Sequence, residues 1–135
     1  MSFLLDTNIL SAHFRRPAGL AHRFFQHSGR LYTSSVALAE LYVWAHNRPD
    51  PTKVLKAIGE MLFEEVSLLD YDRDCADEFG RVRIQLRRTG VEVPSVDLMI
   101  ASVAFVYDLT MPTHNTQDFD IRHKRQTPED SVLDP

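Results

Sequence analysis

The sequence has a single cysteine, few lysines and no apolar run long enough to cross a membrane. Cys75 cannot form a disulfide within the chain, which is typical of a protein from a reducing compartment. The longest apolar run, residues 98–107, is about half the length that a membrane-spanning helix needs. No basic flank precedes the apolar residues at the N-terminus, so no secretory signal is predicted. We therefore expect a soluble, cytoplasmic protein with no membrane partner.

The sequence also lacks the excess of positive charge that is typical of nucleic-acid-binding proteins, since its formal net charge is −4. Divalent ions bound to acidic residues would bring this charge to about 0, so local charge matters more than the total. Most of the basic residues are arginines, which suit bidentate contact with phosphate better than lysines do. They gather in three clusters: Arg15 and Arg16; Arg81, Arg83, Arg87 and Arg88; Arg122, Lys124 and Arg125. Each cluster is equally well explained as an ordinary solvated surface.

Length and composition indicate one globular domain covering residues 1–135. The chain is long enough to bury a core, and its 44% hydrophobic and 25% charged residues are ordinary values for folded proteins. Short apolar runs alternate with helical patterns, which predicts an α/β fold with a mostly parallel sheet. The predicted strands are residues 3–6, 31–33, 65–69 and 110–113. A short predicted helix starts at residue 7, and further helices cover residues 18–27, 35–46, 52–62, 73–88 and 96–107. The predicted N-caps are Ser34 or Ser35, Asp72 and Ser95, and residues 47–51 are a predicted break. In the helix at residues 73–88, Ala76 and three other apolar residues are expected to face the core, and the arginines are expected to face outward. A fifth strand in the C-terminal residues is left open.

Four acidic residues lie within or directly after the most apolar segments: Asp6, Glu40, Asp97 and Asp118. Burying an ionised carboxylate costs several kcal/mol unless a partner compensates it. The segments around the first three contain no lysine or arginine, so no local partner is evident. If the fold gathers these carboxylates, a hard divalent cation would satisfy them, which predicts a metal site. Any one of them is equally well explained as a helix cap or as the partner of a distant arginine.

Four segments that contain these acids resemble the PIN domain, in particular the VapC-type toxins of bacterial toxin–antitoxin pairs. They are residues 3–10 (FLLDTNIL), 34–41 (SSVALAEL), 93–101 (VPSVDLMIA) and 113–119 (THNTQDF). The resemblance implies a three-layer α/β/α sandwich and a magnesium- or manganese-dependent endoribonuclease that cuts RNA. It implies a toxin that inhibits translation by cutting tRNA or rRNA, forms a homodimer and is silenced by a cognate antitoxin.

By this resemblance the four acids form the family's catalytic and metal-binding quartet. Asp6 and Asp97 match its most regular metal ligands. Glu40 binds the ion through water or accepts a proton from the attacking water, and Asp118 completes the ligand set or holds a second ion. Asp118, rather than Asp120, keeps the family's spacing from Asn115.

Three neutral side chains lie at the same predicted strand ends: Thr7, Asn8 and Asn115. They are suited to orienting the carboxylates and water molecules, and they are equally well explained as turn and cap residues. Trp44 follows Glu40 by one helical turn and is more typical of a core residue than of a base-stacking platform. Cys75 is not expected to be a nucleophile, because the acidic residues around it oppose thiolate formation.

Other functional classes fit parts of the pattern. A structure-specific DNA nuclease would use the same acids. Loss of an acid would favour an RNA- or protein-binding module that keeps the fold without catalysis, and all four acids are present here. An Asp-x-Asp phosphatase and a receiver domain are disfavoured because Asp6 is followed by Thr7 and Asn8.

Overall fold

The computed structural model describes residues 2–15 and 29–112. The strands are β1 (Ser2–Leu5), β2 (Arg30–Ser34) and β3 (Ser67–Leu69). The helices are α1 (Thr7–Arg15), α3 (Ser35–His46), α4 (Pro51–Glu64), α5 (Arg73–Arg88) and α6 (Ser95–Tyr107). The predicted helix at residues 18–27, and the predicted site residues Asn115 and Asp118, lie outside the described residues.

The three strands form one parallel sheet in the order β1-β2-β3. Phe3 also forms a parallel bridge with Thr110, through hydrogen bonds from Leu4 N to Thr110 O (2.8 Å) and from Thr110 N to Ser2 O (3.1 Å). β1 therefore lies between β2 and the segment at Thr110. The order of the strands reverses at β1, and in parallel sheets such a reversal is where ligand sites open beyond the carboxyl ends of the strands.

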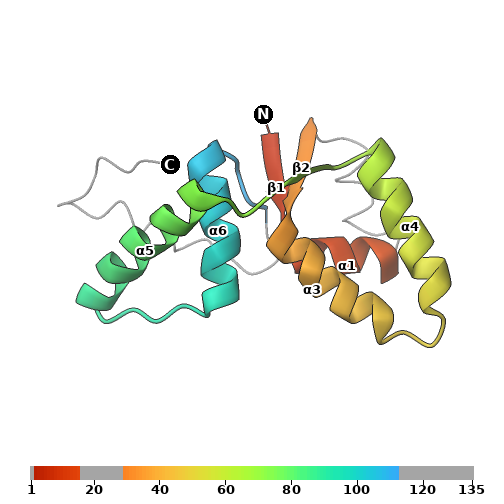
Figure 1. Ribbon diagram of the computed structural model, residues 1–135, viewed down its shortest axis with the longest axis horizontal. Coiled ribbons are helices and arrows are strands. Elements are labelled where there is room, and N and C mark those ends of the chain that lie inside the picture. Colours follow the sequence, from red (N-terminus) through yellow and green to blue (C-terminus); the bar gives the residue numbers. More distant parts are fainter. Residues whose placement is uncertain (1, 16–28, 113–135) are drawn as a thin grey trace.

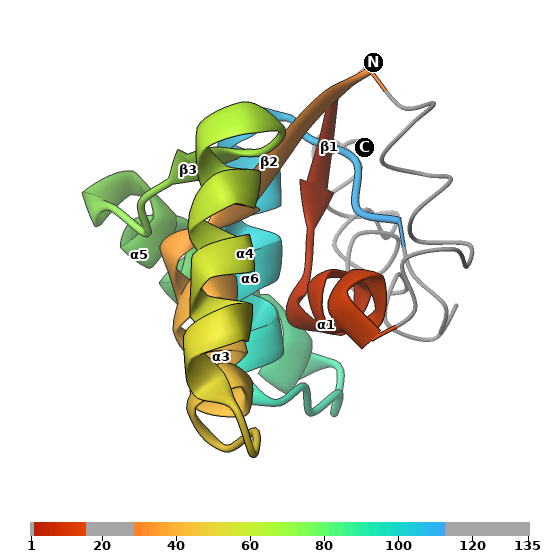
Figure 2. The same ribbon diagram turned by 90° about the vertical axis from the view of Figure 1, so that its right-hand side faces the viewer.

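The helices cover both faces of the sheet. Figure 1 shows α5 and α6 on one side of β1 and β2, with α1, α3 and α4 on the other. In Figure 2 the α4 side faces the viewer, and α3 and α4 lie in front of α6. This arrangement is the three-layer α/β/α sandwich that the sequence predicts. The leucines at the end of β1, Leu4 and Leu5, are fully buried in the main core, together with Val103 from α6. In the ranges that the structure covers, no helix combines the length and the apolar character needed to cross a membrane.

Two predicted strands are shorter in the structure. The third begins at Ser67 rather than at residue 65, because the backbone N–H groups of Glu65 and Val66 both bond to Met61 O and complete the end of α4. The fourth is represented, up to residue 112, by the single bridge at Thr110.

Helix α5 has the predicted bounds, but two predictions about its faces are wrong. Ala76, expected in the core, is exposed, and the neighbouring Cys75 is buried in its place. Arg83, expected to face outward, is only 8% exposed. A buried guanidinium requires hydrogen-bond partners, and those of Arg83 lie at the start of α6, as described below.

Candidate active-site cleft

Asp6 joins β1 to α1 at the carboxyl end of the sheet. Its Oδ1 accepts a hydrogen bond from Ile9 N (3.0 Å), and its backbone oxygen accepts one from Leu10 N (3.1 Å). Asp6 is thus the N-cap of α1, which satisfies one of the helix's first unbonded N–H groups. Next to it, the buried hydroxyl of Thr33 donates to Leu5 O (2.9 Å) and ties the end of β1 to β2. The sequence pattern gave no sign of this role of Thr33.

Thr7 connects the start of α1 to the middle of α3. Its hydroxyl donates to Glu40 Oε1 (2.7 Å) and also lies 3.4 Å from Ala37 O. A hydroxyl has one proton, so the shorter contact to the carboxylate is the stronger bond. α3 itself begins at an N-cap predicted from the sequence, because Ser34 Oγ accepts from Ala37 N (3.0 Å). Thr7 therefore orients the Glu40 carboxylate, a role consistent with the prediction for it.

Asp97 lies in the first turn of α6, as predicted. Ser95, predicted as the N-cap, is instead the first helical residue, and Pro94 occupies the cap position without a side-chain bond. Arg83 from α5 donates to Ser95 Oγ (3.1 Å) and to Val93 O (2.8 Å). The buried arginine thereby holds the segment that leads to Asp97.

These elements enclose a cleft of about 340 Å³. Its lining residues are Asp6, Thr7, Asn8, Glu40, Val43, Trp44, Asp97 and Ile100. The fold therefore brings three of the four predicted acids, and two of the three predicted neutral partners, to one hollow. They come from the β1–α1 junction, α3 and α6, which lie far apart in the sequence.

The acids in this cleft are less buried than the sequence argument assumed. Glu40 and Asp97 are exposed, and Asp6 is partly buried. The expectation of buried charge is wrong for Glu40 and Asp97, since each occurs in an apolar helix yet lies on the face that opens to the cleft. Neighbouring carboxylates in water repel one another less strongly than they would in a low-dielectric core.

The chemistry of the lining fits a hard divalent cation. Carboxylate, hydroxyl and amide oxygens are the ligands that magnesium and manganese prefer, and no lysine, arginine or histidine is among the described residues that line the cleft. Within residues 2–15 and 29–112, however, no three acidic, histidine or cysteine side chains form a ready-made metal-binding group. The three carboxylates surround the cleft, and Asp118 lies outside the described residues. Their role as metal ligands stays a prediction.

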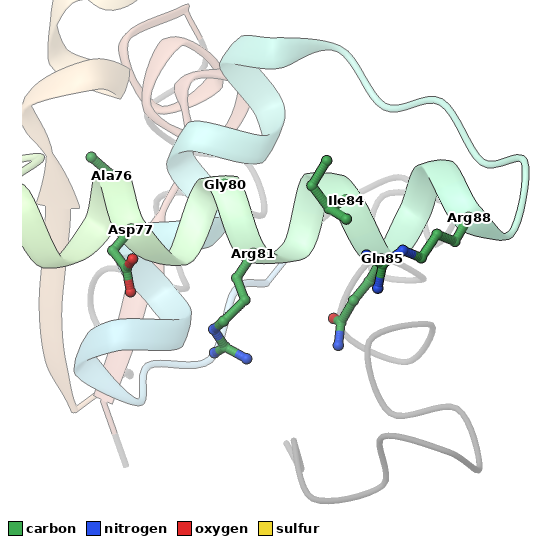
Figure 3. Close-up of a pocket in the computed structure, with 7 residues that line it drawn as sticks. All are labelled: Ala76, Asp77, Gly80, Arg81, Ile84, Gln85 and Arg88. Carbon is green, nitrogen blue, oxygen red and sulfur yellow. The ribbon is translucent and has the colours of Figure 1, made fainter.

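A second, larger hollow of about 530 Å³ lies along α5 and has different chemistry. Figure 3 shows its lining residues: Ala76, Asp77, Gly80, Arg81, Ile84, Gln85 and Arg88. All seven come from one helix, and Asp77 is the only carboxylate among them. The hollow offers no group of acids for catalysis, so the smaller cleft is the better candidate for an active site.

Cys75 is not available as a nucleophile. It is buried, and burial raises the pKa of its thiol to about 11. A bond to the Asp72 backbone lowers this pKa, whereas the negative charges of Asp72 and Asp74 raise it. At neutral pH the group is a thiol, which is a weak nucleophile. The prediction is confirmed, although burial rather than acidic neighbours is the larger cause.

Comparison with known proteins covers most of the chain. Residues 3–124 match the family model described as the PIN domain. The tRNA(fMet)-specific endonuclease VapC of Shigella flexneri is 36% identical over 121 residues, which cover 89% of this chain and 91% of that protein.

Solved structures are similar over the same extent. DNA-bound VapBC from Salmonella typhimurium has a TM-score of 0.75 at 32% identity, over 89% of this chain and 91% of that one. VapBC2 from Rickettsia felis, bound to a DNA fragment from their promoter, has a TM-score of 0.81 at 22% identity, over 90% of this chain and 93% of that one. The likeness to the Rickettsia structure concerns the fold alone.

Proposed function

The chain belongs to the PIN domain family, and on that premise we propose that it is a metal-dependent endoribonuclease, the toxin of a toxin–antitoxin pair. The observation that carries this proposal is the shared cleft, in which Asp6, Glu40 and Asp97 from three separate segments surround one hollow. A similar protein from Shigella flexneri is named as an endonuclease specific for tRNA(fMet), which supports RNA as the substrate.

We assign Asp6 and Asp97 as the metal ligands, with Asp118 completing the set. The ion that we assign to the site is magnesium or manganese. The chemistry that such an ion supplies when bound is positive charge, which offsets the negative phosphodiester and makes a water molecule more acidic. Asp6 is held in place by its bond to Ile9 N, so its carboxylate needs little reorganisation.

Glu40 is assigned to accept a proton from the attacking water. Because the Thr7 hydroxyl bonds to Oε1, the other carboxylate oxygen is the one suited to take up the proton. Asn8 is exposed at the rim of the cleft, where its amide is suited to hydrogen-bond the RNA backbone.

We assign two protein partners. The similar structure from Salmonella typhimurium, 32% identical to this chain, is a VapBC complex, which supports a cognate antitoxin as the inhibitor. A homodimer is the assembly that the family resemblance implies. Inhibition of translation through cutting of tRNA or rRNA follows from the same assignment.

The test is RNA cleavage by the purified chain. Pools of tRNA and rRNA are incubated with magnesium, manganese or a chelator, and Asp97→Asn is compared with Glu60→Gln, a matched loss of one exposed carboxylate on α4. We expect metal-dependent cutting that falls at least about 100-fold in Asp97→Asn and is unchanged in Glu60→Gln.

Two outcomes would contradict the proposal. If the wild type and Asp97→Asn leave all RNA intact but bind it equally well, the chain is a binding module without catalysis. If double-stranded DNA is cut in preference to RNA, the chain is a DNA nuclease.

A further inference from the structure

Trp44 lies at the candidate active site, although the proposed chemistry gives it no role. The sequence favours a core position for it. In the structure it packs partly against the core, is partly exposed, and lines the same cleft as Glu40. The two residues are separated by one turn of α3, about 6 Å along the helix axis. Val43 beside it also lines the cleft and is 72% exposed. One wall of an otherwise acidic cleft is therefore apolar and aromatic.

The indole ring contacts two neighbouring side chains. Phe14 from α1 lies beside it, with 6.5 Å between ring centroids. The guanidinium of Arg48 lies 5.1 Å from the centre of the indole ring, a cation–π contact. These contacts fix the orientation of Trp44, so little side-chain freedom would be lost when a ligand packs against it.

Arg48 supplies a positive charge beside a cleft whose described lining residues include three carboxylates and no basic side chain. The negative charge of carboxylates opposes the approach of an RNA backbone. Arg48 is exposed and lies just after the C-cap of α3, Asn47. Its guanidinium contacts the indole ring, so a positive charge lies beside Trp44, on the side of Trp44 away from Glu40 in the sequence. Guanidinium groups bind phosphate oxygens and stack on planar rings, and both properties suit a nucleotide.

We propose that Trp44 and Arg48 form a nucleotide-binding subsite of the cleft, in which the base of a single-stranded RNA residue beside the cut phosphodiester stacks on Trp44 and Arg48 contacts its phosphate. This inference rests on the proposed function and adds a determinant of substrate binding to it. Aromatic side chains bind single strands by stacking with little dependence on base identity. The subsite therefore selects unpaired RNA rather than a particular sequence.

The test uses the intrinsic fluorescence of Trp44, which is the only tryptophan in the chain. The full-length chain carrying Asp97→Asn is titrated with a single-stranded RNA octamer, which this variant is expected to leave uncut. A second octamer has the same phosphates but abasic sugars. We expect the ordinary octamer to quench and shift the Trp44 emission, and the abasic octamer to leave it nearly unchanged.

Substitutions test the two side chains separately. We expect Trp44→Leu to weaken binding of a labelled octamer about 5- to 100-fold, and Trp44→Phe to retain most of the affinity because it keeps an aromatic face. Arg48→Ala is expected to weaken binding and to reduce the slope of log affinity against log salt by about one. Circular dichroism checks that each variant is folded.

The matched control is Arg30→Ala. Arg30 makes a similar cation–π contact, 5.7 Å from the Tyr32 ring, but it lies at the amino end of β2, opposite the edge that carries Asp6. Its removal is expected to leave RNA affinity unchanged.

Cleavage of the ordinary octamer by the wild-type chain, measured in parallel, keeps this inference separate from the proposed function. Two results would overturn the nucleobase subsite if the wild type cuts the RNA. One is equal quenching by both octamers, and the other is normal RNA affinity in a folded Trp44→Leu. Either result would leave the proposed nuclease activity intact. Base-dependent quenching supports the subsite, whether or not the RNA is cut.

Discussion

Charged residues are arranged differently in the cleft and in the α5–α6 pair. In the cleft, three carboxylates from separate elements surround a hollow whose described lining has no basic side chain. Between α5 and α6, charged groups bond to partners within the chain: Arg83 binds Val93 O and Ser95 Oγ, and Asp72 accepts hydrogen bonds from Cys75 N and the Tyr107 hydroxyl.

This difference separates charge that serves function from charge that serves the fold. Between α5 and α6 the charged groups connect one helix to the other, so removing them should cost stability. In the cleft, three carboxylates from separate elements line one hollow, an arrangement suited to binding a cation rather than to joining two helices. Substitutions in the two regions should therefore affect different measurements.

The largest expected effect is a loss of activity without a loss of stability. Asp6→Asn removes a carboxylate charge but keeps an oxygen that can accept the hydrogen bond from Ile9 N. We expect RNA cleavage to fall about 100- to 1,000-fold, and the melting temperature to stay unchanged or rise as repulsion with Glu40 and Asp97 is relieved. Cleavage rates measure the first quantity, and calorimetry measures the second.

Asp6→Ala is the companion variant, because it removes the charge and the cap together. It should lose activity to the same extent and also lose about 1 kcal/mol of stability. If Asp6→Asn were as unstable as Asp6→Ala, the carboxylate charge of Asp6 would be structural, and the contrast between the two regions would fail.

The next largest effect is a loss of stability in the α5–α6 pair. Arg83→Met removes two hydrogen bonds from a buried guanidinium and leaves Val93 O and Ser95 Oγ without their partner. We expect the free energy of unfolding to fall by about 2 kcal/mol in urea titrations. Arg87→Met, at an exposed position of the same helix, is the control and should change stability by less than about 0.5 kcal/mol.

Thr7→Val should have a moderate effect, which we expect in the rate of RNA cleavage. The variant keeps the shape of the side chain but removes the hydroxyl that orients Glu40. We expect kcat to fall about 10-fold, with a smaller change in KM, because the contact positions a general base rather than binding RNA. A fall in stability with an unchanged kcat would assign Thr7 to the fold instead.

The smallest effect concerns pH. The hydrogen bond from Tyr107 lowers the pKa of Asp72 to about 2, and the same bond raises the pKa of Tyr107 to about 12. Asp72 therefore adds stability above about pH 4, which is lost as the pH falls toward 2. Tyr107 adds stability below about pH 10, which is lost as the pH rises toward 12. Asp72 is partly exposed and Tyr107 is exposed, so water screens the interaction and the effect is small.

Urea titrations of Tyr107→Phe across this pH range test the pair. We expect the variant to lose the part of the alkaline slope that Tyr107 causes, while the part caused by the raised pKa of Cys75 remains. The acid slope should be lost in part, since Cys75 N still bonds to Asp72. Identical pH profiles for the variant and the wild type would show that the bond contributes nothing to folding.

Much of the secondary structure was predictable because the signals are local. Three such signals are present in the structure as predicted: the apolar run of β1, the cap at Ser34 and the cap at Asp72. The predicted break at residues 47–51 is present up to residue 50, since α4 begins at Pro51. The wrong details depend on contacts between distant segments. Arg83 is buried because the start of α6 offers it two oxygens, and an arginine on a polar helix gives no sign of this.

The sequence by itself determined the family, the α/β alternation and the identity of the acids, because these depend on residue types and their spacing along the chain. Only the tertiary structure decided that Glu40 and Asp97 are exposed, and that Trp44 lies on the cleft wall rather than wholly in the core. The physical reason is that the direction a helix face points depends on what packs against the opposite face. α3 packs against α1, α4 and α6, and those contacts turn Glu40 and Trp44 toward the cleft.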